Sequence, residues 1–401
     1  MVIGLLLPGP LVAGPASFLV VGAGPAVSTV LPAISLQAVV HPLGESCSAT
    51  ALCPSTIRTA YNVTPLLSNA SSNGTGQAVV VVDACGDPRM ASDLATFDRT
   101  NSLPKANLTI YYPQGTPCRD SGWSLETALD VEWAHVMAPG AALRLVVSAR
   151  PSNADLFAAW NYSLSHHLGS VFSDSWAGNG ACPGVALKII QAAASQHVTI
   201  LASSGDGGDW GVTTGLVGLY PADCAPTLAV GGTTLTVNST TGVYVSESAW
   251  SGSGGGYVPK TTEKSYQTKV KILDSYGYVA KPDVAAIADP ASAVWVFDQK
   301  EGGWFTVGGT SVACPIWAGF LADANAWRAS NGFGSAGALQ KFFYDTVYGV
   351  NGTRASYAHD FHDVTSGSNG WAAGAGWDAA TGLGSFDAYN LARTIGTSPG
   401  A

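Results

Sequence analysis

A glycine-rich stretch places one hydroxyl where nucleophilic catalysis could use it. Ser311 follows Gly308, Gly309 and Thr310, and a largely apolar run over residues 312–321 comes directly after it. This spacing predicts a tight turn into a buried helix, where free N–H groups and the positive end of the helix dipole face a ligand. A serine in that position could attack a carbonyl group if a base could reach it, or could act only as a helix cap.

The base for Ser311 is predicted to be a carboxylate. Glu126 and Asp130 lie four residues apart where Leu125 and Leu129 recur at helical spacing, so the two acids share a face of a predicted helix. Two such carboxylates repel when both are ionised, so one binds a proton more tightly and they titrate as a pair. The other interpretation is a solvated helix face with two ordinary carboxylates.

Histidine is the usual base of serine hydrolases, but no histidine of this sequence stands in the motif expected of a catalytic base. At low pH imidazole is already protonated, whereas a carboxyl pair can still act as base and acid. None of the seven histidines stands at a glycine-flanked helix start: His41, His135, His166, His167, His197, His359 and His362.

A third acid, Asp206, follows an apolar run over residues 200–204 that predicts a buried strand. Ligands bind at the carboxyl ends of the strands in open α/β sheets. A protonated carboxyl at this position could donate a hydrogen bond to a developing oxyanion. Alternatively, Asp206 is an ordinary turn residue.

These motifs, in this order, resemble the sedolisin family of serine-carboxyl peptidases. The resemblance implies a subtilisin-like fold, with Ser311 as the nucleophile and Glu126 as the general base. It further implies that Asp130 is the partner of Glu126 and that Asp206 is the carboxyl of the oxyanion hole. Further blocks similar to the family are residues 57–63, 229–235, 250–256 and 281–284.

The segment of residues 362–384 is rich in glycine and holds two aspartates, which suits calcium, although a simple turn would look the same. The family resemblance implies one structural calcium ion here. The gap between the aspartates is shorter than is typical of the family, so the loop shape is expected to differ. The implied ligands are the carboxylates of Asp363 and Asp378 and the carbonyls of Val364, Gly374 and Gly376.

Residues 173–178 resemble the edge segment that pairs with the substrate backbone in subtilisin-like clefts. Adding a strand in this way gives affinity that depends little on substrate side chains. Taken alone, the segment fits a glycine-rich surface loop equally well. The expected substrate-binding residues are Ser175, Trp176, Ala177 and Gly178.

The expected fold is α/β and subtilisin-like, with a mostly parallel central sheet and helices on both faces. Apolar runs at residues 78–83, 143–147 and 198–201 predict buried strands, the first ending at Asp83. Residues 186–193 predict a helix between two of them. Such alternation is typical of parallel sheets covered on both faces.

We expect one peptidase domain over residues 46–401, preceded by an apolar segment over residues 1–45. The first 40 residues carry no charged side chain and are broken by glycine and proline. They therefore make a poor membrane span and an atypical signal peptide, or a propeptide remnant. The family usually carries a long inhibitory propeptide, and none is evident in this chain.

Composition suits an acidic exterior. Only 11% of residues are charged, so acidification changes such a surface little. The net charge of −9 predicts no basic patch, which argues against nucleic acid as a partner. Seven cysteines indicate disulfides and export. Their order suggests Cys47–Cys53, Cys85–Cys118 and Cys182–Cys224, with Cys314 as a buried free thiol, although sequence order does not determine connectivity.

The sequence therefore predicts a secreted, monomeric, acid-acting endopeptidase that cleaves proteins or peptides through an acyl-enzyme on Ser311. One alternative is a tripeptidyl exopeptidase of the same family, in which a loop would close one end of the cleft. Another is a non-catalytic binding protein on the same scaffold.

Overall fold

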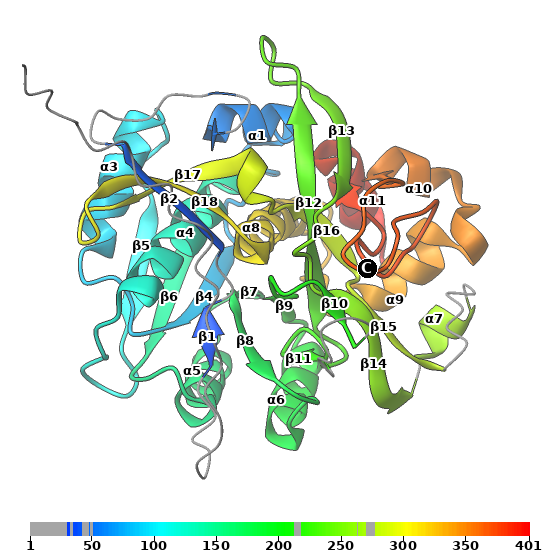
Figure 1. Ribbon diagram of the computed structural model, residues 1–401, viewed down its shortest axis with the longest axis horizontal. Coiled ribbons are helices and arrows are strands. Elements are labelled where there is room, and N and C mark those ends of the chain that lie inside the picture. The colour runs from blue at the N-terminus through cyan, green and yellow to red at the C-terminus, as the bar shows by residue number, and fades with distance from the viewer. Residues whose placement is uncertain are drawn as a thin grey trace, which may run out of the picture.

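The computed structural model describes residues 30–32, 35–41, 48, 51–211, 218–262, 264–269 and 277–401. Its centre is an eight-stranded sheet in which all neighbours are parallel except the β12–β13 pair, as the sequence predicts (Figure 1). Seven strands follow the order β13-β12-β9-β7-β4-β6-β5, and β16 pairs with β12. The strands are β4 (Ala78–Ala84), β5 (Asn107–Tyr111), β6 (Ala142–Ser148), β7 (Val171–Asp174), β9 (Thr199–Ser203), β12 (Leu228–Val237), β13 (Tyr244–Ala249) and β16 (Val284–Ile287).

The valine run of β4 explains why helices cover both faces of this sheet. Val79 and Val81 pack into one apolar cluster, and Val80 and Val82 pack into another, because successive strand residues point to opposite faces. The first cluster contains residues of α3 (Met90–Thr100), α4 (Ser121–Met137), α8 (Thr310–Ser330) and α11 (Ala388–Thr397); the second contains residues of α5 (Asn153–Ser165) and α6 (Gly184–Ser195).

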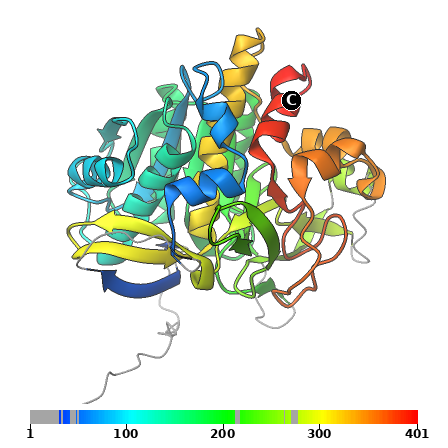
Figure 2. The same ribbon diagram turned by 90° about the horizontal axis from the view of Figure 1, so that it is seen from above.

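Helices α4 and α8 pack against each other in the interior, and Figure 2 shows α8 passing through the middle of the molecule. The Asp120 side chain caps α4 by accepting a hydrogen bond from the Trp123 N–H at 3.0 Å. Helix α8 begins after Gly309, whose φ of 114° is unfavourable for any other residue. These two starts determine where the side chains of the first turns of both helices lie.

Further strands lie around the central sheet in three smaller sheets and one antiparallel pair, β19-β20. One sheet is β2-β18-β17-β3, one is β1-β8-β11, and one is β10-β14-β15. Their bounds are β1 (Leu31–Pro32), β2 (Ser35–His41), β3 (Ala51–Leu52), β8 (Trp176–Asn179), β10 (Asp209–Trp210), β11 (Leu219–Tyr220), β14 (Gly255–Thr262), β15 (Tyr278–Lys281), β17 (Ala293–Asp298), β18 (Gly303–Gly308), β19 (Phe361–His362) and β20 (Ser385–Phe386). The remaining α-helices are α1 (Pro54–Ala60), α2 (Thr64–Leu67), α7 (Ser265–Lys269), α9 (Gln340–Phe342) and α10 (Ala355–Asp360).

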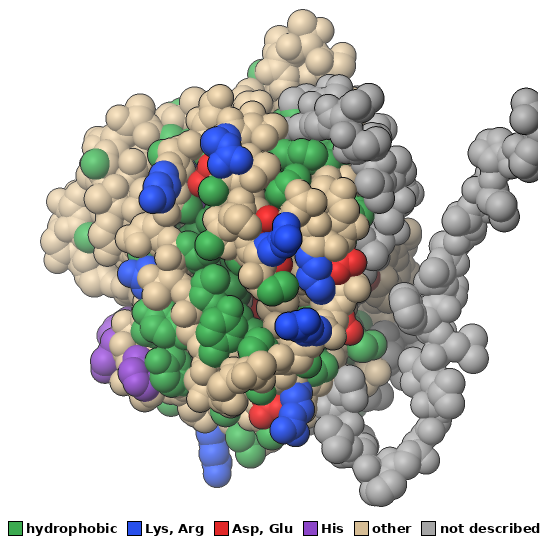
Figure 3. Space-filling model, turned by 90° about the vertical axis from the view of Figure 1, so that its left-hand side faces the viewer, with side chains coloured by type: hydrophobic (Ala, Val, Ile, Leu, Met, Phe, Trp, Pro, Cys, Tyr) green, Lys and Arg blue, Asp and Glu red, His purple; other side chains and the backbone are tan. Residues whose placement is uncertain are grey.

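Two of the predicted disulfides, Cys85–Cys118 and Cys182–Cys224, are confirmed, and Cys314 is a buried free cysteine. Cys53 is disulfide-bonded, while its predicted partner Cys47 lies outside the described residues. No helix within the described ranges is both long and apolar enough to cross a bilayer. On the face drawn in Figure 3, Lys and Arg side chains are spread out, with Asp and Glu side chains between them.

Candidate active site

Helix α4 carries Glu126 and Asp130 into the interior, where neither side chain is exposed. The alternative of a solvated helix face is therefore wrong. Every residue from Trp123 to Met137 is buried, because the sheet, α3, α8 and β17 surround α4. Two carboxyl groups in such an interior carry a large desolvation penalty when ionised.

Ser311, the second residue of α8, lies against Glu126. The Ser311 hydroxyl is close enough to lower the pKa of the Glu126 carboxyl, although neither Glu126 oxygen makes a hydrogen bond of regular geometry. Burial has the larger effect and raises the Glu126 pKa well above its usual value. The negative charge of Asp83 acts in the same direction. The predicted nucleophile and base are thus neighbours in the structure.

Asp130 is held by Ser175, whose Oγ donates a hydrogen bond to Asp130 Oδ1 at 2.7 Å. Burial and the charges of Asp83 and Glu126 raise the pKa of Asp130 well above its usual value. The Ser175 hydroxyl is also 3.5 Å from the Ser311 carbonyl oxygen. Pro315, four residues after Ser311, has no N–H to donate to that carbonyl.

Asp206 lies beside the start of α8. Its Oδ1 accepts hydrogen bonds from the Thr310 N–H at 2.8 Å and from Thr310 Oγ1 at 2.9 Å. The Gly205 N–H in turn donates to Thr310 Oγ1 at 3.0 Å. The turn after β9 is therefore tied to the residue next to Ser311, and the charge of Asp206 raises the pKa of Glu126.

Asp83 is a further buried acid of this cluster, and sequence reasoning gave it no role. It follows the valines of β4, and burial raises its pKa to about 7, while the nearby Thr127 hydroxyl lowers it. Its charge raises the pKa of both Glu126 and Asp130. The available signal was a buried parallel strand that ends in an acid, the usual place for a functional side chain.

The segment predicted to bind substrate forms β8, and both of its edges are paired. Leu31 and Pro32 of β1 pair antiparallel with Ala177 and Trp176, and β11 pairs along the other edge (Figure 1). Within this segment, the Trp176 indole N–H donates to the Val82 carbonyl at 3.0 Å. The Ser175 side chain points to Asp130, so Ser175 is placed to support the acid pair.

Backbone N–H groups orient both aspartates of the loop that is predicted to hold calcium. The Gly376 N–H donates to both Asp363 oxygens at 3.0 Å, and the Gly374 N–H donates to Asp378 Oδ2 at 3.2 Å. Val364, next to Asp363, is buried. Two carboxylates and a glycine-rich backbone form an oxygen-rich set of the kind that calcium prefers. The residue types of the loop therefore suit a calcium ion.

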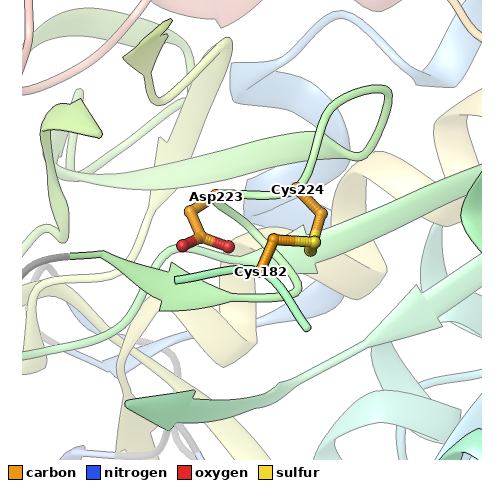
Figure 4. A group of neighbouring side chains, drawn as sticks. All are labelled: Cys182, Asp223 and Cys224. Carbon is orange, nitrogen blue, oxygen red and sulfur yellow. A yellow bond between two sulfur atoms is a disulfide. The ribbon is translucent and has the colours of Figure 1, made fainter. Parts of the chain in front are cut away.

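Two other groups have the spacing of a metal site. Cys182, Asp223 and Cys224 lie together, but Figure 4 shows the two sulfurs joined in a disulfide, which leaves no thiolate for a metal. Asp87, Asp93 and Asp298, which we call the aspartate triad, are all buried and could hold a metal ion.

Comparison with known proteins agrees with this geometry. A model of the subtilase family matches residues 121–377, which contain Glu126, Asp130, Asp206 and Ser311. The chain belongs to the subtilase family. Among solved structures, it is similar to a Pseudomonas sedolisin, a serine-carboxyl proteinase complexed with pseudo-iodotyrostatin. The two share 26% identity with a TM-score of 0.75, over 88% of this chain and 100% of that one.

Relatives within this family carry different names. Sedolisin of Pseudomonas sp. (strain 101) is 29% identical over 88% of this chain and 65% of its own length. Tripeptidyl-peptidase 1 of Canis lupus familiaris is 28% identical over 82% of this chain and 62% of its own length. The chain thus spans slightly less than two thirds of each of these relatives, and it is a sedolisin-like member of the subtilase family.

Proposed function

We propose that this protein is an acid-acting serine-carboxyl endopeptidase. The observation that carries the proposal is the approach of Ser311 to Glu126, with Asp130 on the same buried helix face. In the first step, Ser311 Oγ forms a bond to the scissile carbonyl carbon while its proton passes to Glu126. The proton then goes to the leaving amine as the C–N bond breaks, and water repeats the sequence on the acyl-enzyme.

Asp206 suits the oxyanion role if its carboxyl is protonated. Thr310 holds one carboxyl oxygen next to the start of α8, where the oxyanion would form. A neutral carboxyl can donate a hydrogen bond to that oxygen, and the positive end of the α8 dipole adds to the stabilisation.

Acid operation follows from the use of a carboxyl group as the base. Glu126 works as a base only when ionised, and burial together with the charge of Asp83 opposes that ionisation. The ionised form of Glu126 is least costly while Asp83 and Asp130 stay protonated, and Asp83 ionises as pH rises through about 7. A carboxyl base, unlike imidazole, still has an ionised fraction in acid, so we expect activity below about pH 5.

Replacing the nucleophile tests the proposal. Ser311→Ala should abolish digestion of a denatured protein at pH 3–5, and mass spectrometry of the products should find no new peptides. Circular dichroism should show an unchanged fold, since the change removes one oxygen. Residual cleavage at the wild-type rate would contradict the assignment.

Tripeptidyl exopeptidase action is the second candidate, favoured by the similarity to tripeptidyl-peptidase 1. Comparing cleavage of a peptide with a free and a blocked N-terminus separates the two, because only an endopeptidase tolerates the block. A non-catalytic binding protein is disfavoured by the assembled acid cluster. Titration with a peptide aldehyde, which mimics the tetrahedral species, tests that third candidate.

The substrate backbone is proposed to pair with β8, involving Trp176, Ala177 and Gly178. Because β1 already pairs with Trp176 and Ala177, β1 would have to leave that edge of β8 first. Removing residues 1–34 should lower KM severalfold, whereas removing residues 1–29 should not, since β1 remains. Equal KM values for both variants would contradict this arrangement.

One structural calcium ion is proposed in the C-terminal loop, held by the carboxylates of Asp363 and Asp378 and the carbonyls of Val364, Gly374 and Gly376. Calcium would cross-link this loop and supply no catalytic chemistry. We further propose that the protein acts as a secreted monomer on proteins or peptides in an acidic exterior, consistent with its disulfides and low charge.

A further inference from the structure

The aspartate triad joins three segments of the chain near the first turn of α4. Asp87 lies between β4 and α3, Asp93 lies in the first turn of α3, and Asp298 ends β17. One carboxylate oxygen of each lies within 4.8 Å of those of the other two. Ligands at 2.3–2.6 Å from a calcium ion are separated by up to about 5 Å, so this spacing suits one shared ion.

Two oxygens of the triad have no hydrogen bond of their own. Asp87 Oδ1 accepts from the Arg89 N–H at 2.8 Å, and Asp298 Oδ1 accepts from the Glu301 N–H at 3.1 Å. These bonds orient both side chains and leave each Oδ2 buried without a partner. Asp93 is oriented similarly by the Gln299 N–H, at 2.9 Å from its Oδ2. Buried oxygens of this kind carry a cost unless something binds them.

A fourth oxygen, on α4, points to the same place. The Ser124 side chain is fully buried, and its Oγ makes no hydrogen bond of regular geometry. It is nevertheless close enough to Asp298 to lower the pKa of that carboxyl. A hydroxyl is an acceptable neutral ligand beside carboxylates, so Ser124 supplies a donor from outside the acidic group.

Lys300, a cation whose charge reaches the triad, is bound elsewhere. The charge of Lys300 lowers the pKa of Asp87. Its ammonium group, however, donates to the Asp120 carbonyl at 3.1 Å and lies 3.1 Å from a Glu301 oxygen. The ligand set contains oxygen and no nitrogen or sulfur, which selects a hard divalent ion over zinc or copper.

We propose that Asp87, Asp93 and Asp298, with Ser124, bind a calcium ion at a site separate from the C-terminal loop. The ion cross-links α3, the end of β17 and α4 two residues before Glu126. The ion holds in place the helix that carries Glu126 and Asp130. This inference does not rest on the peptidase activity.

Calcium counting tests the proposal directly. Full-length protein stripped with a chelator is titrated with calcium alone at pH 6.5 by equilibrium dialysis and calorimetry. Asp298→Asn should lose one bound ion relative to wild type, and Asp378→Asn in the C-terminal loop should lose a different one, so that the double variant binds none. Asp345, which pairs with Lys269 and Lys341, supplies the matched control, and Asp345→Asn should bind as wild type does.

A milder variant covers the case in which Asp298→Asn does not fold. Ser124→Ala keeps all three carboxylates and should weaken one calcium affinity at least tenfold while leaving the other unchanged. Magnesium should bind the triad more weakly than calcium. Unchanged stoichiometry and affinity in both the Asp298 and Ser124 variants would overturn the proposal, whatever the outcome for activity.

Discussion

Two clusters of buried acids lie along helix α4, and their partners differ. Glu126, Asp130 and Asp83 are next to side-chain hydroxyls of Ser311, Ser175 and Thr127. The aspartate triad is oriented mainly by backbone N–H groups. A hydroxyl can give up or accept a proton, whereas a backbone N–H only donates a hydrogen bond. The same residue type at the same burial therefore suits proton transfer in one place and a bound ion in the other.

The clusters are close in sequence, and one turn separates them. Asp83 is the last residue but one of β4, and Asp87 comes four residues after it. Between them, Cys85 and Gly86 both have positive φ values, of 59° and 67°, and the Cys85–Cys118 disulfide anchors the turn. This reversal sends the two aspartates to different neighbours, which periodicity alone does not reveal.

The largest expected effect distinguishes the two glutamates of α4. Glu126→Gln should lower kcat/KM at pH 4 by about 10³-fold, because the amide cannot take the Ser311 proton. Glu132 is equally buried, but its Oε2 accepts from the Phe297 N–H at 3.0 Å, a bond that glutamine can also accept. Glu132→Gln should therefore keep kcat/KM within a fewfold. Similar losses of kcat/KM in both variants would mean that replacing any buried glutamate of α4 lowers kcat/KM, whether or not it takes the Ser311 proton.

A second experiment concerns stability. The pKa of Asp83 is raised to about 7, so its favourable contribution is complete below about pH 4 and is lost as pH rises through about 7. Asp83→Asn removes that ionisation and should stabilise the protein at pH 8 relative to wild type, by up to about 4 kcal/mol. Urea unfolding at pH 4 and pH 8 measures this difference. Asp345→Asn serves as the control, because Lys341 and Lys269 lower the pKa of Asp345, and an equal gain in stability there would contradict the cause.

The smallest expected effect concerns the hydroxyl that supports Asp130. Ser175→Ala removes a hydrogen bond that lowers the pKa of Asp130, so that pKa should rise further. We expect kcat to fall about tenfold and the pH–rate profile to shift to higher pH. Ser175→Thr should restore both. Ser163→Ala is the matched control, because Ser163 is also buried and its hydroxyl donates a hydrogen bond to the Ala159 carbonyl within α5. If the pH–rate profile of Ser175→Ala does not shift, Ser175 does not act through the pKa of Asp130.

Local patterns predicted most of the scaffold. The valine run of β4 and the apolar runs of β6 and β9 are strands, and residues 186–193 lie within α6. The motifs around Glu126, Asp206 and Ser311 predicted an assembly that the fold brings together. Asp83 and the aspartate triad were missed, because their members come from separate segments and carry no spacing of their own.

The sequence by itself determined the parallel α/β scaffold and the order of the candidate catalytic motifs, because these depend on side-chain period and residue type. Only the tertiary structure decided that Glu126 and Asp130 are buried, since sheet and helices close around α4 from all sides. It also decided that Ser175 serves Asp130 and that β1 pairs with β8. Those outcomes depend on contacts between distant segments, whose free energies no local pattern encodes.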